Sequence, residues 1–276
     1  RHGFESSSIG KYEGKYYFVY SSKCNHELCY AVSDRPDGGF TYGGVLVSNC
    51  DVGVNGITDE SHAANYAGNN HGGMLCLNGQ YYIFYHRHTC RTSYSRQTCA
   101  EPLRRNADGS FQQAEMTSCG LNGAPLRGKG RYEARIACNL WCDKGTGRYD
   151  VKHSKKRYAH HPYFTQSEKD GSTTAVQYIA NMGSGAVAGF KYFAMEDVKS
   201  IHLEVKGTAS GNMLAARDKE FTDILAEIPV QLLAGQRKVC SGNVRVKNGV
   251  FPLYFKYVGE GTIDFIAFTL ETEENG

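Results

Sequence analysis

The sequence predicts an all-β protein with a partial β-propeller in its first half and a β-sandwich in its second half. Three observations favour this fold. The 276 residues include 32 glycines, 19 tyrosines and 13 phenylalanines, with a net charge of only +3. This composition is typical of β-rich globular proteins with many turns. In addition, the first half contains an internal repeat, and the second half contains alternating apolar and polar segments separated by turn signals.

The repeat joins EGKYYFVYSS at residues 13–22 to NGQYYIFYHR at residues 78–87, with a constant offset of 65 residues. Each segment predicts a hairpin with a tight glycine turn and an aromatic strand. An Asp-Gly turn and a short strand follow each one, in RPDGGFTYGGVLVS at 35–48 and NADGSFQQAEMTS at 106–118. The unit therefore has about four strands, and repeated four-stranded units are typical of propeller blades.

The offset also aligns two polar positions. It places Glu5 on Asn70 and Ser6 on His71, at the start of the first strand of each unit. Because first strands line the axis of a propeller, we expect Glu5 and His71 to face one central cavity, where converging polar side chains form a binding site. The alternatives are a solvated loop carboxylate for Glu5 and a hydrogen-bonded core histidine for His71.

A change of character after about residue 120 marks a domain boundary. Pro125 and several neighbouring glycines indicate a linker, and we place the two domains at residues 1–125 and 126–276. Five segments of the second domain are expected to form strands: AVAGFKYFAM (186–195), KSIHLEVKG (199–207), LAEIPVQLL (225–233), VRVKNGVFPLYFKYVG (244–259) and TIDFIAFTLE (262–271). Their alternation predicts a jelly-roll sandwich.

The ten cysteines form no C-x-x-C pair and have no zinc-finger spacing. We favour free thiols buried in β-sheet, with one or two disulfides as the alternative, so the cysteines leave the compartment open. A metal site at His160 and His161 is not expected, because adjacent side chains diverge in a strand.

Charge and hydropathy argue against two kinds of partner. The small, scattered positive charge does not suggest binding to nucleic acid. No apolar run approaches the length of a membrane span. We therefore expect neither nucleic acid nor a membrane as a partner.

Three segments taken together resemble glycoside hydrolase family 43: FESSSIGKYEGKYYFVYSS (4–22), GNNHGGMLCLNGQYYIFYHR (68–87) and SRQTCAEPL (95–103). The likeness covers about residues 1–125. Members of this family are five-bladed propellers that cleave xylosides and arabinosides of plant cell-wall polysaccharide with inversion. The resemblance implies this fold and activity here, with a plant cell-wall polysaccharide or oligosaccharide as the partner and a secreted or periplasmic location favoured over a cytoplasmic one.

The resemblance also implies roles for three residues. Glu5 falls on the general acid, His71 on a substrate-binding histidine that holds a central water or, through water, a calcium ion, and Arg96 on a substrate-binding arginine. An inverting glycosidase needs a carboxylate base besides the acid. In the family that base, and a second aspartate that tunes the acid, precede the glutamate motif, so both are expected to be missing from this chain.

The chain's own aspartates offer no replacement base. Asp34, Asp51 and Asp59 fall on loops without the expected motif, and we assign none of them. We therefore expect the chain to be the C-terminal part of a longer enzyme, with a non-catalytic carbohydrate-binding protein as the alternative.

The second domain is similar to carbohydrate-binding modules of family 6, through the pattern VKSIHLEVKG (198–207) and LYFKYVGEGTIDF (253–265). Such modules stack sugars on exposed aromatic side chains. Internal packing is the expected role of each candidate aromatic residue: Trp141, Tyr149, Tyr158, Tyr163 and Tyr178.

Overall fold

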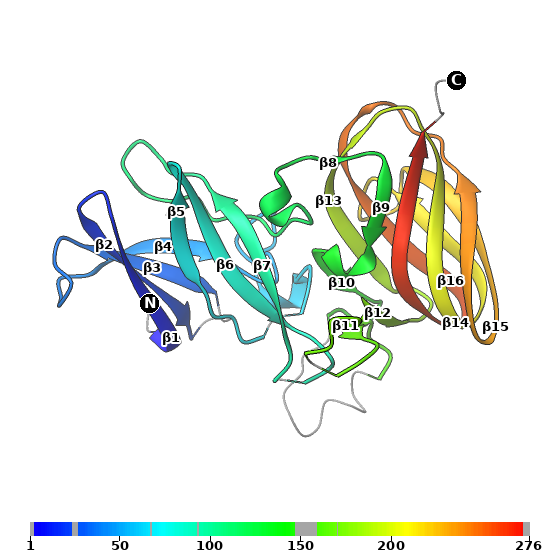
Figure 1. Cartoon of the computed structure of the whole chain (residues 1–276), viewed down its shortest axis with the longest axis horizontal. Helices are drawn as coiled ribbons and strands as arrows, with labels where there is room; N and C mark the ends of the chain where they lie inside the picture. The colour runs from blue at the N-terminus through cyan, green and yellow to red at the C-terminus, as the bar shows by residue number, and fades with distance from the viewer. Residues whose placement is uncertain are drawn as a thin grey trace. The chain divides into compact units, whose positions relative to one another are not determined.

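The computed structural model describes residues 3–23, 27–66, 68–92, 94–146, 159–169 and 171–272, and for residues 3–5 the backbone alone. Its described residues form sixteen β-strands and three short 3-10 helices, and no α-helix occurs among them (Figure 1). The predicted all-β class is thus confirmed. Within this part of the chain, no helix has the length and apolar character needed to cross a membrane.

The chain divides into two compact units. The first comprises Arg1–His88 and Arg96–Met116, and the second comprises Thr89–Ser95 and Thr117–Gly276. Each unit has its own sheets and its own buried side chains, and each is described by itself.

The first sheet of the first unit is a four-stranded antiparallel meander. Its strands, in spatial as well as chain order, are β1 (Gly3–Tyr12), β2 (Lys15–Ser22), β3 (Leu28–Ser33) and β4 (Thr41–Val47). The turn between β1 and β2 uses Glu13 and Gly14, which both have positive φ. The tyrosine-rich run of the repeat therefore forms a strand at the place where the sequence predicted one.

The second sheet has three antiparallel strands. They are β5 (Gly73–Leu77), β6 (Gln80–His88) and β7 (Arg96–Leu103), in that spatial order. The short helix η1 (Glu60–His62) lies in the connection between the two sheets. β5 and β6 repeat β1 and β2 at the offset of 65 residues found in the sequence. β7 takes the place of β3 beside its neighbour, but it lies further along the chain than this offset predicts.

The predicted fourth strand of the second sheet is wrong. Asp108 and Gly109 do form the expected turn, closed by a hydrogen bond from Asn106 N–H to Ser110 O of 2.8 Å. The following residues 111–116, here called the return segment, run instead beside the first sheet. Ala114 N–H donates to Leu46 O at 2.7 Å, and Ala114 bridges Val47 in parallel.

An aromatic layer explains where the return segment goes. The ring of Phe111 lies 5.8 Å from Tyr17, 5.6 Å from Tyr30 and 5.0 Å from Tyr81. Tyr17 and Tyr30 belong to the first sheet and Tyr81 to the second. Phe111 thus buries its ring among aromatic side chains of both sheets, which favours the observed path of the return segment.

The two sheets contact each other through non-equivalent faces. Tyr17 of β2 faces the second sheet, and Tyr81 of β6 faces the first sheet. The counterpart of Tyr17 at the 65-residue offset is Tyr82, which lies on the opposite face of β6 from Tyr81. Tyr81 meets Tyr12 of β1 at a ring distance of 5.7 Å. The front of one sheet therefore packs on the back of the next, which is a head-to-tail arrangement.

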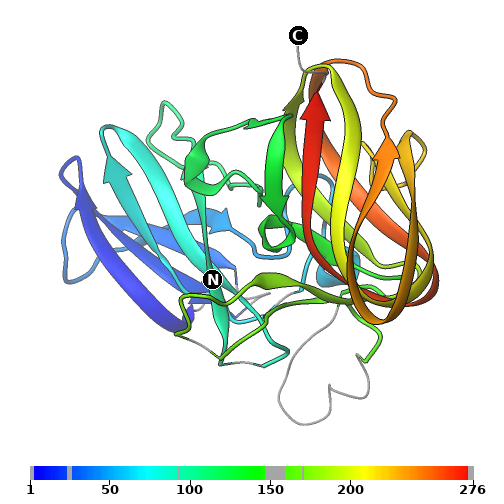
Figure 2. The same cartoon turned by 45° about the vertical axis from the view of Figure 1, so that its right-hand side comes forward.

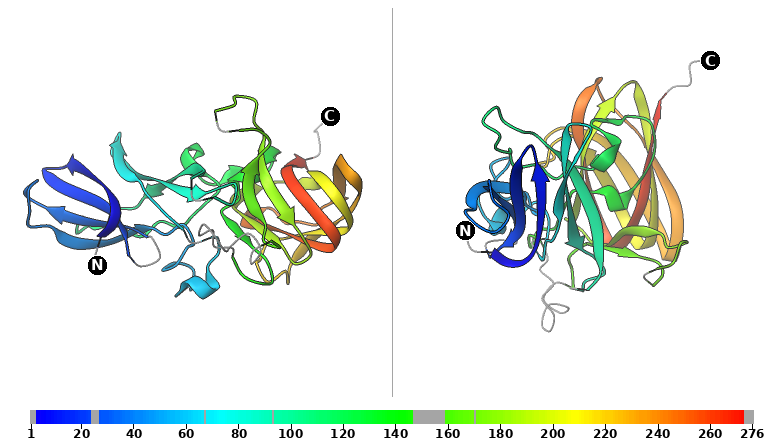
Figure 3. Two further views of the ribbon diagram at one scale, coloured as in Figure 1. Left: turned by 90° about the horizontal axis from the view of Figure 1, so that it is seen from below. Right: turned by 60° about the vertical axis from the view of Figure 1, so that its left-hand side comes forward.

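The second unit contains one nine-stranded sheet. Its strands are β8 (Leu126–Arg127), β9 (Gly130–Glu133), β10 (Asn139–Trp141), β11 (Tyr163–Gln166), β12 (Gln177–Met182), β13 (Val187–Met195), β14 (Val198–Ala216), β15 (Ile224–Asn243) and β16 (Gly249–Thr272). Helices η2 (Gly120–Asn122) and η3 (Ala134–Ile136) lie among the first of these strands. The long strands β14, β15 and β16 curve along their length (Figures 2 and 3).

The sequence predicted two strands, 244–259 and 262–271, where the structure has the single strand β16. The glycines at the break between these two predicted strands are instead paired across to β14. Gly211 lies opposite Gly259, and Ala209 lies opposite Gly261. Together with Gly207, these glycines form a glycine ladder, defined as Gly207, Gly211, Gly259 and Gly261.

The glycine ladder brings the backbones of β14 and β16 unusually close. A Cβ atom on any of the four glycines would lie 2.4 Å or less from a carbonyl oxygen of the opposite strand. The ladder therefore lets the pair bend without breaking its register. Buried side chains from β10 to β16 form one hydrophobic cluster, which includes Phe190, Phe255 and Phe268.

The cysteine prediction is confirmed for the part of the chain that the structure describes. Nine cysteines are free there, and six of them are buried. Cys24 lies outside the described residues.

Candidate functional site

The starts of β1 and β5 lie side by side in the first unit. Ser6 Oγ is 2.9 Å from His71 Nδ1, Ser8 Oγ donates to Gly72 O at 3.3 Å, and Tyr12 OH donates to Met74 O at 2.6 Å. Ser6 and His71 are the positions that the 65-residue offset aligns. Residues at equivalent positions of the sequence repeat are therefore in direct contact in the structure.

The backbone of Glu5 adjoins this contact. Glu5 immediately precedes Ser6, and in the ladder it pairs with Ser21 of β2. A register shift on either side of Glu5 and the positive φ of Ser6, 43°, show that the strand is irregular here. The side chain of Glu5 lies outside the described residues, so its expected orientation toward His71 stays a prediction.

His71 and Arg96 both contact a third residue, His86 of β6. Nδ1 of His86 lies 3.1 Å from His71 N and 3.2 Å from His71 O. On the other side of the ring, Arg96 Nε–H donates to His86 Nε2 at 2.8 Å. The two imidazole rings lie 5.3 Å apart, edge to face. The structure thus brings together two of the three residues named from the sequence.

Asn70 attaches the loop before β5 to the same strand. It is fully buried, and its Oδ1 accepts a hydrogen bond of 3.4 Å from His86 N–H. Among the described residues, Asn70 Nδ2 has no hydrogen-bond partner. A buried amide without a partner is uncommon and costs free energy unless water or a ligand accepts its hydrogen bond.

Ser6 was not predicted as a contact of His71, and His86 was not predicted as a site residue. A signal for His86 existed. His86 and His88 alternate in the run FYHRH that ends β6, so both share the face of Phe84. His88 continues this polar edge, with Nδ1 3.4 Å from Tyr66 OH and its ring 6.2 Å from that of His86.

The aspartates that were not assigned as base have structural roles. Asp34 forms an exposed ion pair with Lys15 at 3.0 Å. Asp51 is buried, and its Oδ1 accepts a hydrogen bond of 2.8 Å from Met116 N–H, which holds the end of the return segment.

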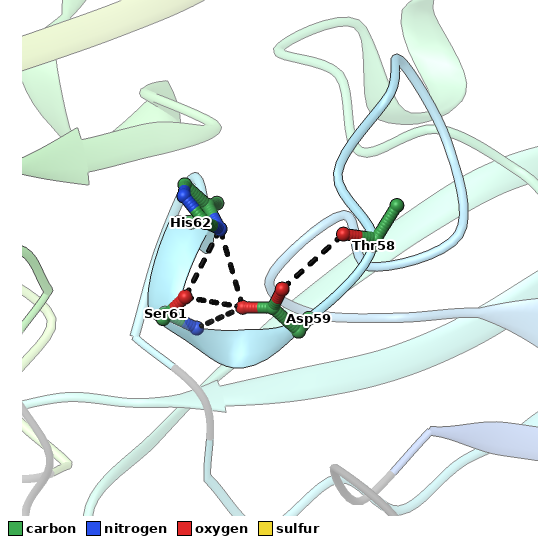
Figure 4. A network of polar contacts seen from close by, with 4 residues as sticks. All are labelled: Thr58, Asp59, Ser61 and His62. Atoms are coloured by element: carbon green, nitrogen blue, oxygen red, sulfur yellow. Dashed lines mark hydrogen bonds and ion pairs between the residues drawn. The ribbon is translucent and has the colours of Figure 1, made fainter.

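Asp59 caps the short helix η1 (Figure 4). Its Oδ1 accepts hydrogen bonds from the hydroxyl and from the N–H of Ser61, the latter at 2.8 Å, and lies 3.2 Å from His62 Nδ1; Thr58 donates to its Oδ2 at 3.2 Å. The Ser61 hydroxyl above all lowers the pKa of Asp59 to about 2. A carboxylate of such low pKa is a weak base.

A calcium site is not formed by the described residues alone. Among them, no three His, Cys, Asp or Glu side chains lie close enough to hold a metal ion. Calcium takes six to eight oxygen ligands, and His71 offers only ring nitrogens. An ion near His71 would therefore need waters or groups from outside this set.

The second unit shows no exposed aromatic platform among the candidates that the structure describes. Trp141 packs on Tyr254 with a ring distance of 6.0 Å, and Arg91 lies 4.9 Å above the ring of Tyr163. Tyr178 is half-buried. Tyr149 and Tyr158 lie outside the described residues, as does most of the basic stretch at 152–164.

A polar groove of about 640 Å³ lies beside β8 and β9. Its lining includes Arg127, Arg131 and Tyr132. The ring of Tyr132 packs on Phe193 and Phe268.

His161 is buried, and burial lowers its pKa, so that its ring is neutral at pH 7.

The chain is similar to known glycosidases. It is 43% identical over 270 residues to a xylosidase/arabinosidase from Thermoclostridium stercorarium, a match covering 98% of this chain and 56% of the relative. A solved glycoside hydrolase family 43 arabinoxylan arabinofuranohydrolase from Bacillus subtilis, in complex with cellotetraose, matches 98% of this chain and 54% of that chain, with a TM-score of 0.53 and 20% identity. A family 6 carbohydrate-binding module from Clostridium stercorarium, in complex with cellobiose, matches 55% of this chain and 99% of the module, with a TM-score of 0.41 and 11% identity.

No family model matches the chain. The chain spans about half the length of the relatives it matches. Its homologues carry the names of glycosidases, and the likeness to the Bacillus structure shows a shared fold. These findings support the relation to family 43 that the sequence motifs indicated.

Proposed function

We propose that this chain forms part of the active site of an inverting family 43 glycosidase acting on arabinofuranosides or xylosides. Glu5 is the general acid, and His71 and Arg96 bind the substrate. The observation that carries the proposal is the contact between Ser6 and His71, because it joins the two motifs at the start of their strands. The identity to a xylosidase/arabinosidase over nearly the whole chain supports the same reading.

The proposed fold of the first unit is two blades of a five-bladed propeller. Head-to-tail contact between the sheets supports it, because a stack of this kind can continue around an axis. The face of β5 and β6 that points away from the first sheet carries Leu75 and Leu77, which are 45% and 57% exposed. These leucines occupy the positions of Gly10 and Tyr12 at the 65-residue offset.

We propose that the general base comes from outside these residues, because Asp34, Asp51 and Asp59 serve the structure of the unit. Calcium held through water at His71 is part of the same proposal. We propose that the second unit is a jelly-roll module related to family 6; it contains the predicted domain at 126–276 and, in addition, Thr89–Ser95 and residues 117–125. A plant cell-wall polysaccharide or oligosaccharide is the proposed partner of the whole protein.

The test uses a polypeptide that carries this chain together with the base. It compares substrates whose leaving group needs a proton from the general acid with substrates whose leaving group does not. Glu5→Gln should slow the hydrolysis of arabinoxylan oligosaccharides by about 10²–10⁴-fold, the usual contribution of general acid catalysis. Aryl arabinosides and xylosides with good leaving groups should lose much less, because their departure needs no proton. Glu13→Gln is the matched control, since Glu13 pairs with Arg105 at the other end of β1.

Equal losses on both kinds of substrate would contradict the acid role of Glu5. Tight binding of xylo-oligosaccharides without turnover in any such polypeptide would favour the alternative, a non-catalytic carbohydrate-binding protein.

A further inference from the structure

The polar groove beside β8 and β9 lies entirely within the second unit. Its volume of about 640 Å³ is within the range of pockets that hold small ligands. Polar and charged side chains make up most of its lining, among them Asn122, Arg127, Arg131 and Glu133. A ligand rich in hydroxyl groups suits such a lining, because its polar groups lose water only where they find hydrogen-bond partners.

Contacts within the unit hold the walls of this groove. β8 pairs in parallel with β13, and Arg127 lies opposite Ala194 in that pair. The ring of Tyr132 lies 5.0 Å from the ring of Phe193, and the Tyr132 hydroxyl donates to Arg127 O at 2.7 Å. A site whose walls are already ordered loses less conformational entropy when a ligand binds.

The carboxylates at the groove are already engaged by arginines. Glu204 accepts two hydrogen bonds from Arg131, at 2.5 and 3.1 Å, and one from Arg237 at 3.2 Å. Glu133 pairs with Arg135. Three arginines therefore share two negative charges before Arg127 is considered.

Arg127 adds a further positive charge to the groove. Its side chain is exposed, and no hydrogen bond or ion pair joins its guanidinium to another residue in the part of the chain that the structure describes. Glu196 and Asp197 line a second groove on which Arg127 also borders, but neither forms an ion pair with it. Burial raises the pKa of Tyr132, and the charge of Arg127 acts in the opposite direction, which places the guanidinium near this hydroxyl.

We propose that the polar groove beside β8 and β9 binds a sugar that carries a carboxylate, a uronic acid, and that Arg127 recognises the carboxylate. A planar guanidinium matches a carboxylate with two parallel hydrogen bonds. Asn122 Nδ2 donates to Cys119 O at 3.2 Å, so its Oδ1 accepts from a ring hydroxyl, as does the oxygen of Tyr132. The choice of a sugar rests on the proposed function, and the choice of an acidic one rests on the charge of the groove.

A solvated surface arginine is the competing explanation. Exposed arginines are common on protein surfaces and need no ligand. The two explanations differ in selectivity. A solvated arginine attracts any small anion weakly, whereas the groove requires the carboxylate and the sugar ring together.

The first experiment is an NMR titration of the chain labelled with ¹⁵N-arginine and ¹⁵N-asparagine. D-glucuronate is the probe, D-glucose has the same ring without the carboxylate, and inorganic phosphate is an anion without a ring. We expect saturable shifts of Arg127 Nε and of the Asn122 side-chain amide with glucuronate, and much smaller shifts with the other two. An equal response to glucose or to phosphate, or no response to glucuronate, would overturn the inference.

The second experiment compares two variants that lose the same charge. Arg127→Gln should weaken glucuronate binding by about 10–100-fold, the usual effect of removing a charged hydrogen-bond partner. Lys129→Gln is the matched control, because Lys129 is exposed and lines the second groove but not the first. Its effect should stay within about twofold, since salt screens charges at a distance. Equal losses in both variants would show non-specific attraction and overturn the inference.

Neither experiment depends on catalysis, so this inference and the proposed function fail separately. A wild-type titration without glucuronate shifts overturns the acidic-sugar site even if Glu5 proves to be the general acid. A saturating titration that Arg127→Gln weakens supports the site even in a polypeptide that hydrolyses no glycoside.

Discussion

Replacing Gly211 by alanine should destabilise the second unit. An ideal Cβ at this position would lie 2.2 Å from Val258 O and 2.6 Å from Gly259 Cα. Both atoms belong to the backbone of β16, so neither can rotate away as a side chain could. The strands would have to separate by about 1 Å to reach an ordinary carbon contact of about 3.5 Å.

The expected cost follows from two opposing effects. Forcing extra volume into a packed site typically costs about 1–3 kcal/mol, and the backbone contact puts Gly211 at the upper end. Alanine recovers about 0.4–1 kcal/mol by restricting the unfolded chain. The net loss should be about 2 kcal/mol, which lowers the melting temperature of a domain of this size by about 4–8 °C.

Gly183→Ala is the matched control in the same unit. Its Cβ would meet Thr262 Cγ2 at 3.8 Å, an ordinary contact, and like Gly211 it does not have a positive φ. This variant should be neutral or more stable by up to about 1 kcal/mol.

Unfolding in urea can be followed by the fluorescence of Trp141, which is the single tryptophan of the chain. The assay therefore reports on the second unit alone. A Gly211→Ala variant as stable as the wild type would refute the steric reasoning. Equal destabilisation by Gly183→Ala would show that the loss does not depend on the close approach of β14 and β16.

Two further predictions concern stability. Phe111→Ala should destabilise the first unit by about 3–5 kcal/mol in urea denaturation, because it empties the aromatic layer, whereas the exposed Leu77→Ala should stay within about 0.5 kcal/mol; similar values for both would contradict the role of the layer. Burial raises the pKa of Asp264 above its ordinary value of 3.8, although Asn181 N–H donates to it. The folded state therefore binds the proton more tightly than the unfolded state, and wild-type stability should fall as pH rises from below 3.8 through the raised pKa. Asp264→Asn should remove this fall and raise the melting temperature at pH 7, and a variant that keeps the wild-type pH dependence would contradict the assignment.

Local signals in the sequence predicted much of the fold. The period-2 pattern and tyrosine content of residues 15–22 and 80–88 identified β2 and β6, and the Asp-Gly pairs identified the turns. The 65-residue offset aligned Ser6 with His71, and the structure places these two residues in contact. These features depend on residues adjacent in the chain or on the internal repeat, and both can be recognised in the amino-acid sequence.

The predictions were wrong where contacts between residues far apart in the sequence determine the structure. The Asp-Gly turn before the return segment indicates a fourth strand of the second sheet. The ring of Phe111, however, packs on Tyr17, Tyr30 and Tyr81, which lie 30 to 94 residues earlier in the chain. Gly259 and Gly261 separated two predicted strands, but in the structure they lie within β16, opposite Gly211 and Ala209 of β14. The contacts of His86 come from distant residues: His71 from the loop before β5, and Arg96 from β7, which pairs antiparallel with β6.

The return segment also has a consequence for synthesis. The outer edge of β4 is made early, but Ala114, which pairs with it, and Phe111, which fills the aromatic layer, follow roughly 70 residues later. At about 5–20 residues per second, a ribosome needs about 4–14 seconds for that interval. During this time the first sheet exposes an unpaired strand edge and an incomplete apolar layer, which are features that promote association between nascent chains. The first sheet of the chain is therefore completed last in its unit, and polypeptides that end before residue 111 should be the aggregation-prone products of interrupted translation.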